Sequence, residues 1–165
     1  MKRLSLLLLL FMTCGSCGRI VDRTIHLIPA GYVGEVYILH NIADGAPAKR
    51  EGGAVVYEMP VDGVLRTQTP VGDGDFFYTR YFFVNSRGER TRISEIWDTT
   101  IPDTPENRAD NTVGVAYPVT GTFRDNEKGC EVRYEGYYVG TKSYVLANNN
   151  RRGLSDYLDQ HPVCK

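Results

Sequence analysis

The chain has 165 residues, and its 19 Lys and Arg residues nearly balance its 20 Asp and Glu residues. This length suggests one domain of ordinary size, and the balanced charge indicates no electrostatic attraction to nucleic acid. Hydrophobic residues make up 42% of the chain and charged residues 24%, which excludes disorder throughout. The 11 Tyr and 17 Gly residues, spread between short apolar runs, favour β-structure with tight turns.

The first residues of the chain form a short leader with a basic start. Lys2 and Arg3 precede a mainly apolar run over residues 4–12. A helix needs about 20 apolar residues to cross a bilayer, so this run is too short to span one and fits an export signal. The leader, followed by Ser16-Cys17-Gly18, resembles a bacterial lipoprotein signal. That resemblance implies cleavage before a cysteine, whose thiol then carries lipid.

The leader also sets the expected organisation of the chain. We expect residues 1–16 to be the signal peptide, residues 17–23 a short tether and residues 24–165 one folded domain. Cys17 is the favoured lipidation site because a small residue precedes it, and Cys14 is the alternative. A plain secretory signal without lipid is the competing interpretation.

Two cysteines, Cys130 and Cys164, fall in the expected folded domain. In the oxidising compartment that an export signal implies, such a pair is expected to form a disulfide. A Cys130–Cys164 bond would tie the tail to a strand and, in the chain-entropy model, stabilise the fold by about 3–4 kcal/mol. A metal site is the competing interpretation, but no cluster of histidines accompanies these cysteines.

The first half of the domain consists of short apolar segments bounded by Gly, Pro and Asp. Alternation of side chains with period two, clearest in Gly34–Asn41, predicts strands. Gly52-Gly53 and Asp62-Gly63 predict tight hairpin turns, because such turns need residues with positive φ. The segments on either side of each turn are therefore expected to pair as a meander. The predicted strands are residues 24–28, 34–41, 54–59 and 64–69.

The second half contains the most apolar segment of the domain, Phe76–Val84, which is aromatic on both faces. Such a segment is typical of a central strand buried on both sides. Leu154, Tyr157 and Leu158 recur at helical spacing, which predicts a short C-terminal helix over Gly153–Gln160. The other predicted elements are strands at residues 90–96, 112–123 and 130–139, and a long surface loop at residues 98–111.

Together these segments predict a mainly β protein. We expect one antiparallel β-sandwich, transthyretin-like or Ig-like in outline, with a short C-terminal helix. The sequence contains no internal repeat and no second long apolar stretch, so we expect no further domain.

A series of turn-rich motifs covers much of the domain. In their order along the chain they resemble a family of bacterial proteins that is catalogued only as a domain of unknown function. The resemblance spans about residues 25–140 and implies export, often with a lipoprotein signal. It implies no activity and no catalytic residue, because the family has no assigned activity. The motifs are Ile28-Pro29-Ala30-Gly31-Tyr32-Val33-Gly34, Arg50-Glu51-Gly52-Gly53, Val56-Tyr57-Glu58-Met59-Pro60 and Gly63-Val64-Leu65-Arg66-Thr67.

Candidate catalytic residues are few. The sequence has no Gly-x-Ser-x-Gly elbow, so it predicts no serine nucleophile. His26 and His40 fall in predicted strands and would face each other if those strands were adjacent, yet a metal site needs three or more ligands. We therefore expect no catalytic residue, no metal site and no cofactor. The alternative is an envelope hydrolase or metal-dependent enzyme that uses His26, His40 and nearby acids.

Three arginines, Arg87, Arg90 and Arg92, flank one predicted hairpin. Arg90 and Arg92 share a strand face because side chains alternate along a strand. Such a group would bind an anionic partner, for example a carboxylate or a lipid headgroup. A solvated edge strand that resists aggregation is the other interpretation.

These features predict a lipid-anchored protein of the bacterial cell envelope, on its periplasmic or its surface face. We expect a binding or structural module and not an enzyme. Its expected partners are the membrane, through the N-terminal lipid, and an envelope protein or a glycan. The short tether would hold the domain close to the membrane surface.

Overall fold

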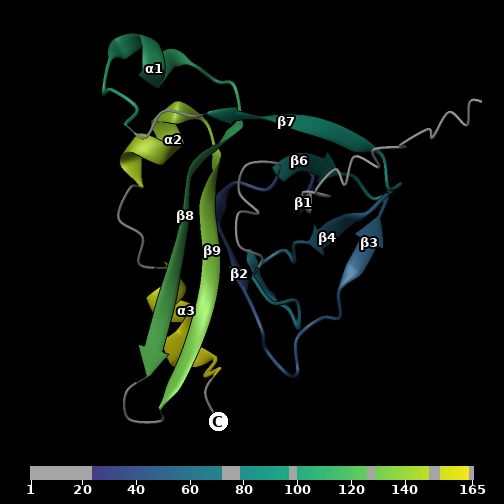
Figure 1. The fold of residues 1–165 in the computed structure, drawn as a ribbon. Coiled ribbons are helices and arrows are strands. Elements are labelled where there is room, and N and C mark those ends of the chain that lie inside the picture. The colour runs from purple at the N-terminus through teal and green to yellow at the C-terminus, as the bar shows by residue number, and fades with distance from the viewer. Residues whose placement is uncertain (1–23, 72–78, 97–99, 126–128, 149–152, 164–165) are drawn as a thin grey trace, which may run out of the picture.

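The computed structural model describes residues 24–71, 79–96, 100–125, 129–148 and 153–163. Within these ranges one sheet of nine strands, in the order β3-β4-β1-β6-β7-β8-β9-β2-β5, curls into a half-barrel (Figure 1). The prediction of a mainly β domain is confirmed. The strands are β1 (Thr24–Pro29), β2 (Gly34–Leu39), β3 (Lys49–Glu51), β4 (Ala54–Glu58), β5 (Val64–Arg66), β6 (Thr79–Val84), β7 (Arg90–Ile96), β8 (Gly114–Asp125) and β9 (Cys130–Gly140).

The sheet is mixed, so the purely antiparallel arrangement that the sequence predicts is wrong. β1 runs parallel to both of its neighbours, β4 and β6, and β2 runs parallel to β5. β7 and β8 are parallel as well. The predicted second layer of a sandwich is also not found among the described strands. The curl replaces it, because the apolar inner sides of β1, β4 and β6 pack against those of β2 and β9.

Two glycine turns show what local sequence decides. At Gly52-Gly53 both φ angles are positive, 56° and 85°, and β3 and β4 pair around this turn as predicted. At Gly63 φ is 78° and the Gly63 amide donates to the Pro60 carbonyl oxygen, so the predicted turn is present. However, β5 pairs with β2 and not with β4. The turn reverses the chain, but the curl of the whole sheet selects the partner strand.

Three short helices accompany the sheet (Figure 1): α1 (Pro105–Ala109), α2 (Lys142–Ala147) and α3 (Gly153–Gln160). α3 confirms the predicted C-terminal helix. α1 lies within the segment predicted as a surface loop, and α2 has no counterpart among the predicted elements. Both are short and begin after a threonine, Thr104 or Thr141, whose side chain accepts a hydrogen bond from the helix backbone. A single threonine is a weak sequence signal for the start of a helix, because threonine also occurs in the strands of this chain.

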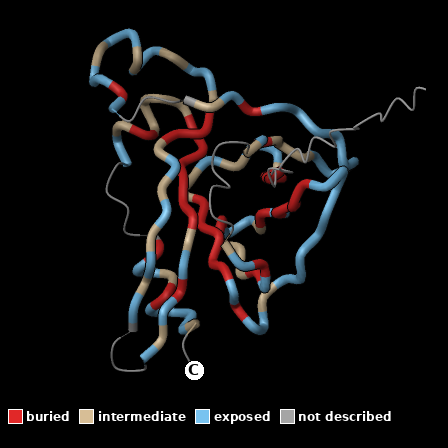
Figure 2. The backbone as a smooth tube through the Cα atoms, in the orientation of Figure 1, coloured by how far each residue is buried: buried red, intermediate tan, exposed pale blue. Residues whose placement is uncertain are grey.

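The sheet buries apolar residues on both of its faces. Residues such as Ile28, Tyr57 and Val139 form the inner core. On the outer face of β2 and β9, α3 packs Leu154 and Leu158 against a second cluster, and α2 packs against a third. The red stretch along β9 and β2 in Figure 2 lies between these layers. Strands β2 and β9 are therefore rigid supports for whatever lies on the outer face.

Several predicted features fall on residues that lie outside the described part. These are the signal peptide and tether (residues 1–23), the first residues of the predicted central strand (76–78) and Cys164. β6, the described remainder of that strand, pairs on both sides and is central as predicted. Of its described residues only Tyr81 is buried, so the predicted burial on both faces is not found there. Among the described residues, no helix has the length and hydropathy that a membrane span requires.

Candidate functional site

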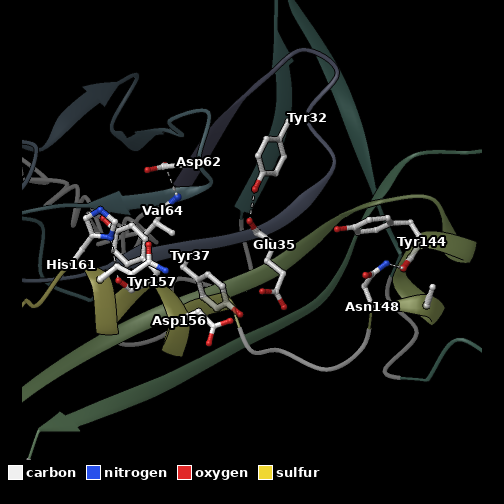
Figure 3. A pocket seen from close by; sticks show the side chains of 12 residues that line it. Tyr32, Glu35, Tyr37, Asp62, Val64, Tyr144, Asn148, Asp156, Tyr157 and His161 are labelled. Carbon is white, nitrogen blue, oxygen red and sulfur yellow. Dashed lines mark hydrogen bonds between the residues drawn. The ribbon is translucent and has the colours of Figure 1, made fainter.

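A cavity of about 600 Å³ opens on the outer face of the sheet, between α2 and α3 (Figure 3). Its floor comes from β2 and the start of β5, and its walls come largely from the two helices. Its volume is within the usual range for small-molecule sites, about 300–1,000 Å³. We call this cavity the helix pocket. The described residues that line it are Tyr32, Glu35, Tyr37, Asp62, Val64, Tyr144, Ala147, Asn148, Asp156, Tyr157, Gln160 and His161.

The alternation of β2 supplies the floor. Val36 points into the inner core, so its neighbours Glu35 and Tyr37 point to the outer face and into the helix pocket. The Tyr32 hydroxyl donates to the Glu35 carbonyl oxygen and closes one side. Gly63 allows this close packing, because a Cβ at its position would clash with that carbonyl oxygen and with the Tyr32 hydroxyl. The φ of 78° at Gly63 also favours glycine.

The junction of β9 and α2 builds one wall. The Thr141 hydroxyl accepts a hydrogen bond from the Tyr144 amide at 3.2 Å and starts α2. Gly140 makes room for Tyr144, since a Cβ on Gly140 would lie 2.6 Å from the Tyr144 ring. Asn148 Nδ2 donates to the Tyr144 carbonyl oxygen at 2.8 Å and satisfies the end of the helix. The Tyr144 hydroxyl points toward Glu35 (Figure 3).

α3 builds the opposite wall. Leu154 and Leu158 are 8% and 6% exposed and hold the helix on the sheet. With these two side chains directed inward, Asp156 and Tyr157 border the helix pocket. The Tyr157 ring stacks on the His161 ring, with centroids 4.5 Å apart and planes 19° from parallel. The apolar spacing that predicts α3 therefore also orients the polar side chains of this wall.

The described lining of the helix pocket is acidic. Glu35, Asp62 and Asp156 bring three carboxylates, and none of the described lining residues is Lys or Arg. Burial is the main cause that raises the pKa of Tyr32 to about 12, and the nearby Tyr144, Asp62 and Glu35 add to it. Burial, followed by the charge of Glu35, also raises the pKa of Tyr144. Both phenols stay protonated at neutral pH, so they offer hydroxyl groups to the helix pocket.

His26 and His40 lie in one cluster, but they reach it from strands that are not adjacent. β1 and β2 do not pair, and the curl brings both imidazole rings to the Tyr57 ring, at centroid distances of 5.3 and 5.9 Å. His40 Nε2 lies 3.1 Å from Glu135 Oε1, and His26 Nδ1 lies 2.9 Å from the Tyr137 hydroxyl. We call these five residues the buried histidine cluster.

The buried histidine cluster is sealed in the core. His26, His40 and Glu135 are 1%, 2% and 4% exposed, and none of them lines the helix pocket or a second cavity of about 670 Å³ at the end of β1. Burial is the main cause that lowers the pKa of His26 to about 4; the charge of Glu135 opposes it and that of His40 adds to it. In the described part of the chain no three His, Cys, Asp or Glu residues are placed to hold a metal ion. The geometry therefore offers the enzyme alternative no open site at these histidines.

The three arginines proposed to contact a partner lie on the hairpin of β6 and β7. Arg90 and Arg92 share the outer face of β7, as predicted. Arg90 makes a two-pronged ion pair with Glu51, with N–O distances of 2.9 and 2.8 Å, which joins β7 to β3. Arg87 lies in the exposed turn of the hairpin. The charge of Arg90 is thus engaged within the fold, Arg87 and Arg92 are exposed, and the partner contact of the three arginines stays a prediction.

The structure describes only part of the predicted cysteine sites. Cys130 begins β9 and lies beside the outer cluster that holds α3. Val163 packs against the same cluster, so the tail returns toward the strand that carries Cys130. Cys164, Cys14 and Cys17 lie outside the described residues. The disulfide and the lipidation site therefore stay predictions.

The motifs of the sequence mark little of the helix pocket, since Tyr32 and Val64 are the described lining residues that fall within them. Its side chains come from β2, from the turn before β5 and from the two helices, which are distant along the chain. The available signal is the alternation of β2, which places Glu35 and Tyr37 on one face. The sequence does not show what covers that face, and it predicts only α3 of the two helices that border the cavity. The covering helices are what turn an exposed strand face into a site.

Comparison with known proteins connects this chain to one family and one solved fold. A crystal structure at 2.75 Å of a "putative lipoprotein" from Bacillus anthracis matches with a TM-score of 0.59 and 20% sequence identity. The match covers 84% of this chain and 92% of that chain. No curated protein matches the chain. Residues 21–148 match the model of DUF6843, a family of unknown function. This span contains every motif that carried the resemblance and most of the chain, and the protein therefore belongs to the family DUF6843.

Proposed function

We propose that this protein is a lipid-anchored binding protein of the bacterial cell envelope and that the helix pocket is its ligand site. The observation that carries the proposal is the cavity itself, which is walled by two helices and floored by a buried strand pair. Its polar groups converge from separate elements, as they do in sites that orient a small molecule. The ligand is a free small molecule or a projecting group of an envelope component.

The N-terminal sequence supports the lipid anchor. Ser16-Cys17-Gly18 follows a basic and apolar leader, and the Bacillus anthracis protein of the same fold carries a lipoprotein description. Residues 18–23 span at most about 20 Å when fully extended, at roughly 3.3–3.6 Å per residue. An anchor at Cys17 would therefore keep the helix pocket within reach of other components at the membrane surface.

Metabolic labelling tests the anchor. Cells that express the full chain are grown with an alkyne-tagged fatty acid, and the wild type is compared with Cys17→Ala and Cys14→Ala. We expect lipid on the wild type and on Cys14→Ala, and none on Cys17→Ala. Loss of the label in Cys14→Ala alone would assign the lipid to Cys14. A wild type without label contradicts the anchor and favours a plain secretory signal.

Site-specific photocrosslinking in the same cells tests the ligand site. A photoreactive amino acid is placed at Gln160 on the wall of the helix pocket or at Arg87 in the β6–β7 turn. Both positions are exposed, so the substitutions are expected to leave the fold intact. Mass spectrometry then identifies what each position captures.

Capture of an envelope component at position 160 and not at position 87 supports the helix pocket as the site. The reverse result moves the site to the arginine hairpin. Capture at neither position, from cells in which the protein is abundant and anchored, contradicts a binding role. A purely structural role would then be the better interpretation.

A further inference from the structure

The curled sheet consists of two halves that meet in two places. One half is β3-β4-β1-β6-β7 and the other is β8-β9-β2-β5, and in the described sheet the pairing of β7 with β8 joins them (Figure 1). This ladder is short, with three residue pairs between Ser94–Ile96 and Gly114–Ala116. Across the interior of the curl, the described strands β1, β4 and β6 have no backbone pairing with β2 or β9 and meet them through side chains. We call this second contact the seam.

The buried histidine cluster lies in the seam and draws on both halves. His26 and Tyr57 come from β1 and β4 in the first half. Glu135 and Tyr137 come from β9 in the second half, and His40 follows β2. The Tyr137 hydroxyl reaches across to His26 Nδ1, and the His40 ring packs against the Tyr57 ring. The charge state of this cluster therefore acts directly on the contact between the halves.

The pair of His40 and Glu135 holds a proton. His40 Nδ1 lies 3.2 Å from the Thr69 carbonyl oxygen, and a carbonyl oxygen can only accept, so Nδ1 carries a hydrogen. His40 Nε2 lies 3.1 Å from Glu135 Oε1, at the distance of an ion pair. Without a proton on either atom, two lone pairs would face each other inside the core. The carboxylate of Glu135 is therefore already neutralised by its histidine.

His26 lies in the same cluster but is held differently. Its Nδ1 is 2.9 Å from the Tyr137 hydroxyl, and its Nε2 is buried with no hydrogen-bond partner among the described residues. The rings of Tyr57 and Tyr81 pack edge-on against the imidazole, with centroids 5.3 and 5.0 Å away. These neighbours suit a neutral ring and leave one of its nitrogens unsatisfied.

The surroundings of His26 supply one counter-charge for two histidines. Burial raises the pKa of both Tyr81 and Tyr137, so these phenols stay neutral. Among the described residues, the charges that act on His26 are those of Glu135, which favours a proton there, and of His40, which opposes it. A proton on His26 would add to the core a positive charge that the cluster cannot balance, because Glu135 already shares a proton with His40.

We propose that the buried histidine cluster is an acid-sensitive lock that holds the two halves of the curled sheet together. While His26 is neutral, the seam is closed. When His26 takes up a proton, two positive rings compete for one carboxylate and the seam opens. The halves then turn about the short ladder of β7 and β8, and the ladders within each half stay paired. The inference does not depend on the proposed function, since the floor and both helices of the helix pocket belong to the second half.

Distance measurements between spin labels test the opening. Keto-bearing amino acids carry the labels in the exported mature protein in detergent, so the native cysteines stay unmodified. One pair joins the halves, at Arg87 in the β6–β7 turn and Thr122 on β8, and both positions are exposed. The matched control pair, Thr122 and Gln160, lies within the second half. We expect the first distance to lengthen reversibly by several ångströms between neutral pH and about pH 4, and the control distance to stay constant.

Variants assign the opening to His26. His26→Gln cannot take up the proton, so we expect its distance between the halves to stay short near pH 4. His161→Gln is the matched control, because His161 is exposed outside the cluster, and it should open like the wild type. Equal widening in His26→Gln and in the wild type overturns the lock.

Histidine NMR separates protonation from opening. The chain has three histidines, so ring-labelled protein gives three titration curves, and each single variant identifies one of them. In His40→Asn the carboxylate of Glu135 is left to His26, so we expect the midpoint of His26 to rise by about one pH unit and the seam to stay closed after protonation. If His40→Asn loses its fold, His26→Gln still tests the proposal.

Two further outcomes contradict the lock. A wild type whose His26 is protonated while the distance between the halves stays short shows that the seam tolerates the charge. Simultaneous broadening of the control distance shows that acid unfolds the whole domain and does not open the seam. Neither outcome depends on what the helix pocket binds, so the proposed function is tested separately by labelling and photocrosslinking.

Discussion

The helix pocket and the buried histidine cluster use similar side chains on opposite faces of one sheet. Each combines histidine, tyrosine and carboxylate groups, and the region of β2 serves both. Glu35 and Tyr37 project to the outer face, whereas His40, just after the strand, lies on the inner side. The difference is access: Glu135 is 4% exposed, while Asp156 stands on the surface of α3.

This comparison shows that access decides what a set of polar side chains does. In the sealed cluster each charge must be balanced by the protein itself, so a change there acts on stability and on its pH dependence. In the open cavity water solvates the charges until a ligand replaces it, so a change there acts on binding. The predictions below test this division, from the largest expected effect to the smallest.

The largest effect is expected from Glu135→Gln. The change removes the carboxylate 3.1 Å from His40 Nε2 inside the core. Breaking a buried pair typically costs about 3–5 kcal/mol, so we expect a loss of that order in the free energy of unfolding. Denaturant unfolding measures it, with Glu131→Gln on the same strand as control. Glu131 pairs with Arg124 on the surface, and its loss should cost at most about 0.5 kcal/mol. Equal effects of the two variants would contradict the distinction.

The disulfide prediction concerns the α3 wall of the helix pocket. If Cys130 and Cys164 are bonded, Cys164→Ser removes the covalent link between the tail and β9. The chain-entropy model gives a loss of about 3–4 kcal/mol, and α3 should detach more readily from its cluster. Thermal unfolding with and without reductant measures this: reductant should destabilise the wild type and leave the variant unchanged. Two free thiols in the exported wild type would show that the bond is absent.

The pH dependence of stability tests His26. Its pKa is about 4 in the folded protein against 6.5 when exposed, so the folded state binds fewer protons between these values. Stability from this group is complete above pH 6.5 and is lost as the pH falls toward 4, by about 3 kcal/mol at pH 4. His26→Gln removes this slope while keeping a polar partner for Tyr137. Unfolding curves from pH 7 to pH 4 measure the difference.

The control for this prediction is His161→Gln. His161 is exposed beside α3, where it stacks on Tyr157. We expect its replacement to leave the pH profile of stability unchanged. A wild-type profile that His26→Gln does not flatten would show that acid sensitivity arises elsewhere in the chain.

The smallest effect on stability is expected at the helix pocket. Asp156→Asn should leave the free energy of unfolding within about 0.5 kcal/mol of the wild type, because the side chain is exposed and α3 is held by Leu154 and Leu158. The same variant is expected to weaken capture by a photoreactive residue at position 160, because Asp156 borders the helix pocket. A large loss of stability together with the loss of binding would mean that Asp156 stabilises the fold. The helix pocket would then not differ from the buried histidine cluster in the way proposed.

Local features of the fold were the easiest to predict. The apolar spacing of Leu154 and Leu158 predicts α3 with the bounds that the structure has, since an amphipathic helix needs little beyond its own sequence. The turn at Gly52-Gly53 predicts its hairpin for the same reason. Strand positions in the second half also agree, including the long pair of β8 and β9. In each case the responsible contacts are close along the chain.

The arrangement of the strands could not be predicted in the same way. The turn at Gly63 is present, but the strand that follows it pairs with β2 through contacts that no local pattern encodes. The helix pocket depends on this arrangement, because Glu35 and Asp62 come together only when β5 lies beside β2. The two histidines likewise meet through the curl and not through a ladder between their strands.

The sequence by itself determined the class of the protein: a leader that resembles a lipoprotein signal, a mainly β domain, its tight turns, its C-terminal helix and its family. These follow from composition, from short periods and from motifs, each of which is encoded within a few residues. Only the tertiary structure decided that one mixed sheet curls, that it seals His26, His40 and Glu135 inside, and that two helices enclose a polar cavity outside. The physical reason is that burial is a property of the whole fold. The same carboxylate is a structural partner when the sheet closes over it and a candidate ligand group when the sheet leaves it open.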